Sequence, residues 1–554
     1  KDDIPSIKLT NNAEVISNSR DNKEVDSAVL DQIDAPENII NLAYSKRISG
    51  GVLEKLLFQI RLLLWKRFVE QTKDKNDLLK LFVPPIIIFV LMILIYEAFT
   101  FFADGGIEQI LAPMAFWIYI QRLVVHIMYE KANRLQESMR MMGLSDFAYW
   151  SSYFITDGII LGFVLSLMCS ILTVGGLFNN ANFGEIFGML LVFCLSVVPF
   201  GFFLTSFFDT PQTCGQFTFA SLLGMTAVFI VVIMADEKTV PLETAQNILC
   251  LFPPLALHVA ATTFLKSHEG ITLPAVCGWM VADIFIYSAL AWYFSQVWPS
   301  KVGVQKPPHF ILLPSYWFPS LGAKQTSDCN ARRHSRINCE EETGEMQSHD
   351  EDIPVELVNE GLMGSPTVVV DRLCKTFSRS ATKAVNNLSF NMYENQIFAL
   401  LGHNGAGKTT CINMLTGMTR PDLFHATDTS IYGSSLLHDM DKIRFSMGVC
   451  PQHDVLFEKL SVKEHIMFFA QLKGASYEQA TQEAEYYSNL FHLRTRLDHL
   501  GTELSGGQRR KLSVAIAVCG GSKFVVLDEP TAGMDPLARR ELWDLLASLR
   551  TGRT

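Results

Sequence analysis

Four residues in the stretch Leu400–Thr410 have the types and the spacing that bind a phosphate group. They are Gly402, Gly407, Lys408 and Thr409, in the pattern G-x-x-x-x-G-K-[ST]. Glycine lets the backbone curl until several N–H groups point at one anion, and the start of a following helix adds partial positive charge. We therefore expect Lys408 to contact the β- and γ-phosphates of a nucleotide and Thr409 to hold Mg²⁺ through its hydroxyl.

An acidic pair further along the chain suits the same chemistry. The apolar run Phe524–Leu527 is typical of a buried strand, and Asp528 and Glu529 follow it directly. A carboxylate at the end of a parallel strand can lie beside the phosphates, so we expect Asp528 to complete the Mg²⁺ shell. The adjacent Glu529 is placed to orient or deprotonate the attacking water.

A second glycine-rich turn, Ser505-Gly506-Gly507-Gln508, lies between these two motifs. A serine and two glycines at the start of a helix form an anion cradle, and in a single copy this cradle has no phosphate of its own. Gln452 lies in a turn between the first loop and this cradle. The sequence has no N-K-x-D run of the kind by which a GTPase recognises guanine, which favours ATP.

The elements that must position these residues are visible in the pattern of apolar residues. We expect Ile397–Leu401 to be the strand before the first loop and Thr410–Leu415 to be the helix after it. Val368–Val370 begins another strand. The helical pattern of Ser461–Tyr487 predicts part of a helical subdomain that carries the Ser505 turn.

The order of the motifs GHNGAGKTT, CPQHD, LSGGQ and LDEPTAGMDP resembles that of the ATPase of ABC transporters. The sequences of these motifs are most similar to those in the first nucleotide-binding domain of the A subfamily, whose known members mostly move lipids. The resemblance covers about Val368–Thr554 strongly and Gly51–Trp317 more loosely. It implies an α/β P-loop NTPase domain of ABC type that follows a membrane α-helical bundle.

The resemblance also implies roles for individual residues. Lys408, Gln452 and Glu529 would be catalytic, and Thr409, Gln452 and Asp528 would hold Mg²⁺. Phe377 would stack on adenine, although it is also compatible with an ordinary strand residue. The Ser505–Gln508 turn (Ser505, Gly506, Gly507, Gln508) would cap ATP bound by a second ABC half. The residues implied in the ATP-binding loop are Gly402, His403, Asn404, Gly405, Ala406, Gly407, Lys408, Thr409 and Thr410.

Composition points to a membrane protein. The chain has 554 residues, of which 49% are hydrophobic, and its mean hydropathy is +0.21. A net charge of −10 does not favour a nucleic-acid partner. The 11 cysteines form no C-x-x-C pair, so we expect reduced packing residues rather than disulfides or a metal site.

Several apolar runs are long enough to cross a bilayer, which takes roughly 20 residues of helix. The six candidate spans are Pro84–Phe102, Ile110–Met128, Ser151–Leu177, Ile186–Phe208, Phe217–Ala235 and Thr272–Trp298. Pro253 and Pro254 interrupt a further run, Ala245–Phe264, which we expect to be a re-entrant pair of short helices. The distribution of Lys and Arg places both ends of the six spans, and hence the ATPase, in the cytosol.

Two helical segments lie beside the spans. Gly51–Glu70 has the pattern of a basic amphipathic helix in the headgroup region. Tyr129–Gly143 resembles the helix by which the family's membrane domain docks on its ATPase, and a solvated helix extension is equally compatible. Four polar residues fall at membrane depth, where they either line a pathway or act structurally. These residues are Arg122, Asp157, His258 and Asp283.

These observations give a domain organisation. Residues 1–50 form a disordered polar segment, 51–300 the transmembrane domain, 301–365 a cytosolic linker and 366–554 the nucleotide-binding domain. Two departures from the A subfamily stand out: the first two spans are joined by only Ala103–Gln109, and the switch histidine is expected near position 560, beyond Thr554. We therefore expect this chain alone to bind ATP and to hydrolyse it weakly or not at all.

The function that we predict is ATP-driven transport of lipid by an integral, multi-pass membrane protein. ATP and Mg²⁺ are the expected cofactors. A second ABC half, fused downstream or supplied by a dimer partner, is the expected protein partner. An ABC-type channel or regulator that moves no lipid, and an importer of the same architecture, are the alternatives.

Overall fold

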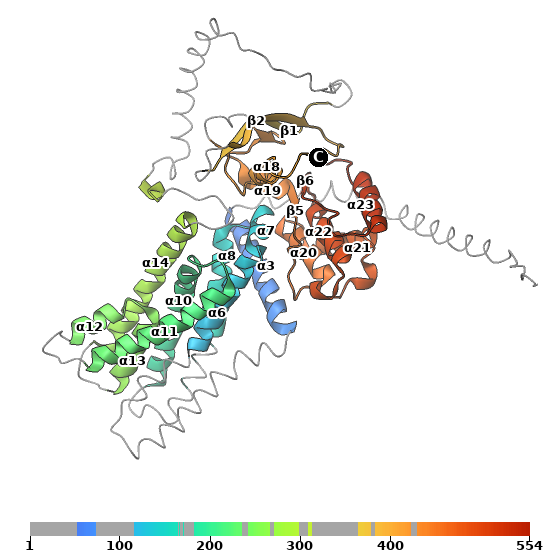
Figure 1. The fold of residues 1–554 in the computed structure, drawn as a ribbon. Helices are drawn as coiled ribbons and strands as arrows, with labels where there is room; N and C mark the ends of the chain where they lie inside the picture. The colour runs from blue at the N-terminus through green and yellow to red at the C-terminus, as the bar shows by residue number, and fades with distance from the viewer. Residues whose placement is uncertain are drawn as a thin grey trace, which may run out of the picture.

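The computed structural model describes residues 52–73, 116–163, 166, 170, 182–234, 242–265, 271–298, 308–312, 364–377, 383–422 and 429–554. A group of helices, α3 to α14, makes up one part, and an α/β part from β1 to α23 makes up the other (Figure 1). Helices α3, α7 and α8 lie where the two parts meet (Figure 1).

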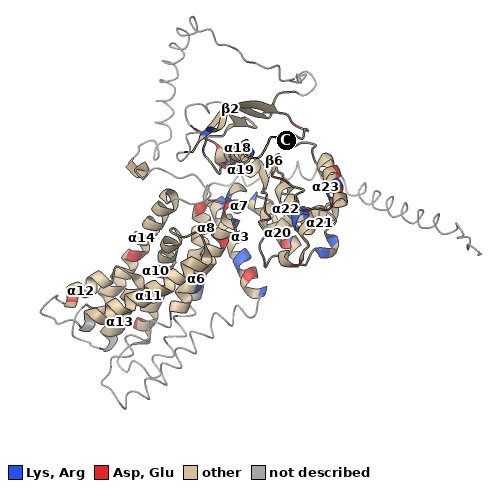
Figure 2. Ribbon diagram, viewed as in Figure 1, with Lys and Arg blue, Asp and Glu red and all other residues tan. Residues whose placement is uncertain are grey.

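Three helices among the described residues are long and apolar enough to cross a membrane. They are α10 (Phe183–Thr205), α11 (Pro211–Met234) and α14 (Leu273–Val297), and few charged residues mark them in Figure 2. They correspond to the last three predicted spans. The predicted span Pro84–Phe102 lies outside the described residues, so a total of six stays a prediction.

The second and third predicted spans are described only in part. Helix α6 (Trp117–Ala132) covers most of the second. Helix α8 (Asp146–Tyr153) continues as a π-helix, η1 (Phe154–Leu161), at the start of the third. A π-helical turn inside an α-helix carries an extra residue per turn and is frequent at functional sites.

The break in the predicted re-entrant run is confirmed. Helix α12 (Leu242–Leu249) ends before the prolines, and α13 (Pro253–Leu265) begins at the first of them. Proline has no N–H for the preceding turn, so it is tolerated in the first turn of a helix and not in its middle. The hydroxyl of Tyr287 donates to the carbonyl of Leu251 at 2.9 Å and ties the break to α14.

Two small sheets form the centre of the α/β part. In the first, the strands run antiparallel in the order β2-β1-β3-β4. In the second, β5 pairs in parallel with β6, and Cys450 lies opposite Leu527. The strand bounds are β1 Val368–Thr376, β2 Lys383–Met392, β3 Ser430–Ile431, β4 Ser434–Ser435, β5 Met447–Cys450 and β6 Phe524–Leu527.

Six α-helices complete this part of the structure. Helices α18 and α19 lie near the sheets, α20 to α22 form a helical group beside β5, and α23 lies at the outer edge (Figure 1). Their bounds are α18 Lys408–Leu415, α19 Met440–Ser446, α20 Val462–Leu472, α21 Tyr477–Leu490, α22 Gly506–Val518 and α23 Pro536–Ser548. Short 3₁₀ turns occupy Phe310–Leu312, Arg494–Arg496 and Gly501–Glu503.

The predicted strand Ile397–Leu401 is wrong in this structure. No strand is assigned over these residues, and the side chain of Leu401 is 86% exposed. An apolar run becomes a strand only when a neighbouring strand pairs with it. Here Thr554, not this run, pairs with the edge of β6, because its carbonyl accepts from the Val525 amide at 2.9 Å. The carbonyl of Arg553 in turn accepts from the Asn395 amide at 2.7 Å.

The helical group beside β5 begins its helices with reciprocal caps. Ser461 and Glu464 form a capping box at α20, and Ser476 and Gln479 form another at α21. Each box satisfies two backbone N–H groups that the first turn leaves without helical partners. Gly474, at a φ of +99°, ends α20 and separates the two helices of the predicted run Ser461–Tyr487.

His465 of α20 is a buried neutral histidine. Its Nε2 accepts from the Phe457 amide at 2.9 Å, and its Nδ1 lies 2.8 Å from the Ser461 carbonyl, so the proton belongs on Nδ1. Burial lowers the pKa of His465 to about 4, against a smaller opposing effect of the Ser461 carbonyl. The unfolded chain therefore binds this proton more tightly than the folded chain does.

We expect acidification to destabilise the α/β part through His465. Stability should be complete above the unfolded pKa of about 6.5 and fall as the pH drops toward 4, by roughly 3 kcal/mol for this group. Urea unfolding at several pH values, followed by the protease sensitivity of the α/β part, measures the effect. The variant His465→Gln keeps an acceptor for Phe457 and should flatten the pH dependence, whereas His438→Gln, at an exposed position, should not.

Candidate functional site

The glycine-rich loop that runs into α18 has the backbone conformation that its sequence requires. Gly405 and Gly407 have φ values of +88° and +91°, in the region that side chains with a Cβ avoid. A Cβ on Gly407 would lie 2.3 Å from the Ala384 carbonyl oxygen. The first helical bond of α18 runs from the Cys411 amide to Gly407, so the amides before it point out of the helix start.

Lys408 extends over this loop. Its Nζ donates to the carbonyl of Gly402 at 2.6 Å and to that of His403 at 3.0 Å. The ammonium group and the N-terminus of α18 therefore present positive charge on the same side of an exposed loop. This set of donors fits a chain of phosphates.

The acidic pair and Gln452 come together at the carboxyl ends of β5 and β6. The Gln452 Nε2 donates to Glu529 Oε2 at 3.1 Å, and the Asp528 amide donates to the Cys450 carbonyl at 2.9 Å. Burial and the neighbouring Glu529 raise the pKa of Asp528, and Lys408 is among the cations that oppose this. The expected ligands, which are the hydroxyl of Thr409, the amide oxygen of Gln452 and the carboxylate of Asp528, are oxygen donors of the kind that Mg²⁺ prefers.

Glu529 has an unusual backbone. Its φ is +48°, a left-handed conformation that costs a residue with a side chain about 1–3 kcal/mol. Such strain is maintained only where the surrounding contacts fix it. The contacts that do so come from Arg510, a residue that sequence reasoning missed because no motif position marks it.

The Ser505 turn lies at the start of α22, away from the acidic pair. Ser505 caps the helix: its Oγ accepts from the Gln508 amide at 3.3 Å, and its own amide donates to Gln508 Oε1 at 3.1 Å. The residues Ser505 and Gly506 are exposed. Within the described structure, this turn makes no hydrogen bond to the glycine-rich loop.

Phe377 follows the end of β1 and is 45% exposed. The Nζ of Lys375 lies 5.8 Å from the centre of its ring. The ring is therefore available for stacking, as a ligand-binding aromatic must be, and it also remains compatible with a surface position. The residues after it, 378–382, are outside the described part of the chain.

Helix α7 (Leu135–Met141) contacts the α/β part, which agrees with the docking interpretation of Tyr129–Gly143. Met141 is buried in one cluster with Ile443, Met447 and Leu436. A Cβ on the next glycine, Gly143, would lie 3.4 Å from the Phe445 ring. The alternative of a solvated extension is not what the structure shows.

Helix α3 (Val52–Lys73) covers the predicted basic amphipathic segment. Two of its basic side chains are buried in the protein and do not face a headgroup region. Lys66 and Arg67 are 1% and 3% exposed. Lys66 donates to Glu130 at 2.7 Å, and Arg67 donates to Asp157 at 2.8 Å. The predicted headgroup position therefore does not hold for these two residues, because carboxylates on α6 and η1 pair with them inside the protein.

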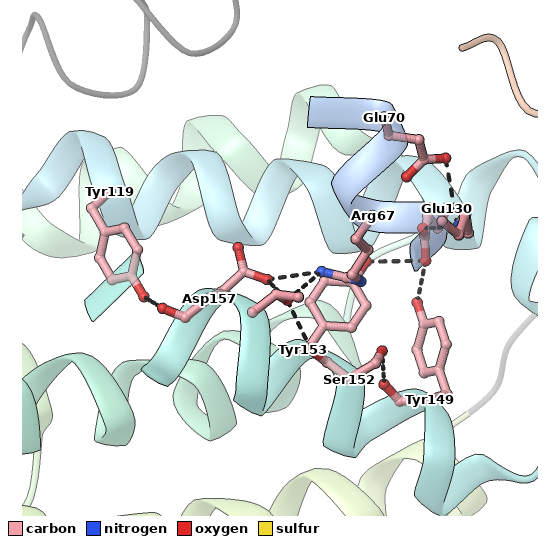
Figure 3. Close-up of polar contacts among 10 residues, drawn as sticks. Arg67, Glu70, Tyr119, Glu130, Tyr149, Ser152, Tyr153 and Asp157 are labelled. Atoms are coloured by element: carbon pink, nitrogen blue, oxygen red, sulfur yellow. Dashed lines mark hydrogen bonds and ion pairs between the residues drawn. The ribbon is translucent and has the colours of Figure 1, made fainter. Parts of the chain in front are cut away.

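Aromatic residues complete this buried polar network (Figure 3). The hydroxyls of Tyr149 and Tyr153 donate to Glu130 at 2.9 and 3.0 Å, and the Arg67 guanidinium lies 3.1 Å above the ring of Tyr153. The Nζ of Lys66 lies 4.1 Å above the ring of Phe457. Phe457 belongs to the α/β part, in the segment between Gln452 and α20. One helix thus contacts both the membrane helices and the α/β part.

The polar residues at membrane depth differ in their surroundings. Asp157 is paired with Arg67, which supports a structural role. His258 lies 3.1 Å from Thr226 Oγ1 and stacks on Phe229. Both carboxylate oxygens of Asp283 are buried without a hydrogen-bond partner among the described residues.

The cysteines agree with the prediction of reduced packing residues. Eight are free within the described part of the chain, and seven of these are buried.

Two family models match the chain. Residues 385–532 match the model described as "ABC transporter", and residues 95–293 match the model described as "ABC-2 family transporter protein". A phosphate-binding loop and an acidic strand end in one part, joined to apolar helices in the other, define an ATP-binding cassette with a membrane domain. The chain belongs to the ABC transporter family.

Its relatives are members of the A subfamily. "ABC transporter A family member 2" of Dictyostelium discoideum is 34% identical over 82% of this chain and 27% of its own length. "Retinal-specific phospholipid-transporting ATPase ABCA4" of Mus musculus is 35% identical over 79% of this chain and 20% of its own. "Phospholipid-transporting ATPase ABCA3" of Homo sapiens is 32% identical over 77% and 26%. The chain thus spans about a fifth to a quarter of these relatives.

Proposed function

We propose that this chain is the part of an ATP-driven transporter that binds and hydrolyses ATP and moves phospholipid within or out of a bilayer. The observation that carries the proposal is the hydrogen bond from Gln452 to Glu529. It joins the turns that follow β5 and β6, and the second of these turns begins with Asp528 and Glu529. Relatives whose names include phospholipid transport support the choice of lipid.

In this proposal the loop Gly402–Thr410 holds the phosphates of ATP with its amides and with Lys408. Thr409, Gln452 and Asp528 would hold Mg²⁺, which supplies charge neutralisation at the phosphate oxygens. Glu529 orients or deprotonates the attacking water, and its hydrogen bond with Gln452 fixes the carboxylate for that task. Phe377 stacks on the adenine ring.

A second ABC half completes the site in this proposal. The exposed turn Ser505–Gln508 would cap ATP held by that half, and the equivalent turn of the partner would cap ATP at Lys408. ATP can drive closure of the pair only if it binds the closed state more tightly than the open state. Helices α3 and α7 then carry the movement to an integral, multi-pass membrane domain whose ATPase faces the cytosol.

Reconstitution tests the proposal. The protein reconstituted with a second ABC half in liposomes of phosphatidylcholine with labelled phosphatidylethanolamine and phosphatidylserine should hydrolyse Mg-ATP faster than in detergent and should change the leaflet of labelled lipid. Removal of Mg²⁺ with EDTA should abolish both. Hydrolysis without lipid movement would favour a channel or regulator, and movement in the inward direction would favour an importer.

A prediction about coupling follows from α7. Replacing Met141 by Ala removes a buried side chain from the cluster that joins the membrane domain to the ATPase, a change of about 2–5 kcal/mol at a fully packed site. We expect lipid stimulation of ATP hydrolysis to be lost while hydrolysis without lipid continues. Gln136→Ala, on a less buried position of the same helix, is the control. Full lipid stimulation in Met141→Ala would contradict the role of α7.

A further inference from the structure

The side chain of Arg510 contacts both turns that carry Gln452 and Glu529. It extends from α22 and is 3% exposed. Its Nη1 donates to the carbonyl of Pro451 at 2.7 Å and to that of Gln452 at 3.2 Å. Its Nη2 donates to the Glu529 carbonyl at 2.7 Å, and its Nε to the Pro530 carbonyl at 3.1 Å.

Two further acceptors complete the surroundings of the guanidinium. Nη2 also donates to the Asp528 carbonyl at 2.5 Å, and Nη1 lies 3.4 Å from Asp454 Oδ1. Arginine has five N–H donors in a rigid planar fork. One buried cation therefore satisfies backbone carbonyls of two separate turns, which an ammonium group with three donors on a flexible stem does not reproduce.

These contacts explain how the strained turn at Glu529 is maintained. The carbonyls of Asp528, Glu529 and Pro530 all accept from Arg510. They surround the residue whose φ is +48°. The same cation fixes the turn at Gln452, whose side chain donates to the Glu529 carboxylate. Without the guanidinium, the two turns lose the group that holds them at a common distance.

Arg510 also has a particular place on its helix. It lies in the second turn of α22, and Ser505 is the N-cap of that helix. A shift of the helix start, where the exposed Ser505 turn lies, displaces the Arg510 side chain together with it because a helix moves as a rigid unit. Arg510 thereby connects the loops of Gln452 and Glu529 to the Ser505 turn, which in the proposed function caps the ATP held by the second ABC half.

We propose that Arg510 is a positioning residue for ATP hydrolysis, which aligns Gln452 and Glu529 and links their alignment to occupancy of the Ser505 turn. The inference rests on the proposed function, since it presupposes hydrolysis at Glu529 and a second ABC half. Within the described structure, Arg510 donates no hydrogen bond to the glycine-rich loop. Its removal should therefore lower the rate of hydrolysis far more than nucleotide affinity.

The test compares Arg510→Lys and Arg510→Met with Arg509→Gln in the protein reconstituted in phosphatidylcholine liposomes. Arg509 is the neighbouring cation, and its guanidinium donates within its own helix start, to Leu504. We measure kcat and KM for Mg-ATP, the binding of a fluorescent ATP analogue, and Tm. Arg510→Lys should lower kcat about a hundredfold, as expected for misplaced catalytic groups, with analogue binding unchanged. Arg509→Gln should match the wild type.

A second measurement separates positioning from a merely structural role. If Arg510 acts through the Gln452 turn, Arg510→Lys and Gln452→Ala should not be additive in kcat. A loss of analogue binding in step with a lower Tm in Arg510→Lys would overturn the inference, as would a kcat like that of the wild type. If Arg510→Met does not fold, Arg510→Lys alone decides. If the wild type hydrolyses no ATP even with a second ABC half present, the proposed function itself is overturned.

Discussion

Replacement of Glu529 by Gln is expected to lower the rate of ATP hydrolysis by about 10²–10⁴-fold, the range that general-base catalysis contributes. The amide cannot take a proton from water, yet it has nearly the same shape as the carboxylate. Gln452 can still contact it, and the glycine-rich loop is untouched. ATP should therefore still bind, and the nucleotide should accumulate in the protein unhydrolysed.

The measurement is release of phosphate from Mg-ATP by the reconstituted protein, together with binding of a fluorescent ATP analogue. Glu541→Gln is the matched control, because Glu541 lies on α23 and pairs with Lys511 at 3.0 Å, away from the acidic pair. Its rate should equal that of the wild type. A Glu529→Gln protein that hydrolyses ATP within tenfold of the wild-type rate would remove Glu529 from the mechanism.

Replacement of Arg67 by Met is expected to have the largest effect on stability. The change leaves Asp157 with a buried charge and takes the cation from the face of Tyr153 (Figure 3). Breaking one partner of a buried ion pair costs about 3–5 kcal/mol, because the other charge is left without compensation. The double variant Arg67→Met/Asp157→Leu removes both charges and should recover most of the loss.

Thermal unfolding in lipid nanodiscs, followed by tryptophan fluorescence, measures this effect. The exposed pair Arg140–Asp146 provides the comparison, since its nitrogen–oxygen distance is 2.9 Å and its side chains are 40% and 42% exposed. Arg140→Met should cost about 0–1 kcal/mol, as exposed pairs do. Equal losses of stability in Arg67→Met and Arg140→Met would show that burial does not determine how much the network contributes to the free energy of unfolding.

The local parts of the fold were accessible from sequence. Phe524–Leu527 forms β6 with the predicted bounds. The helix predicted over Thr410–Leu415 spans Lys408–Leu415, and Ser505 caps α22. In each case neighbouring residues determine the structure: an apolar β-branched run, a glycine before a helix, or a serine three residues before a glutamine. The roles of the residues in these motifs stay predictions.

The parts that sequence did not predict depend on residues far apart in the chain. Ile397–Leu401 has the composition of a strand, but pairing with a neighbour, not composition, determines whether it becomes one. Lys66 and Arg67 resemble solvated cations until Glu130 and Asp157 are placed beside them. Arg510 donates to backbone carbonyls, which every residue possesses, so no side-chain pattern reveals its partners.

The buried network on α3 also constrains the order in which the protein is built on the ribosome. Lys66 precedes its partner Glu130 by 64 residues, and Arg67 precedes Asp157 by 90. Until those residues leave the ribosome, Arg67 lacks Asp157, and Lys66 has only Glu70 of its own helix, at 3.7 Å, as an acidic partner. The network on α3 is therefore complete only after the chain has been synthesised as far as Asp157.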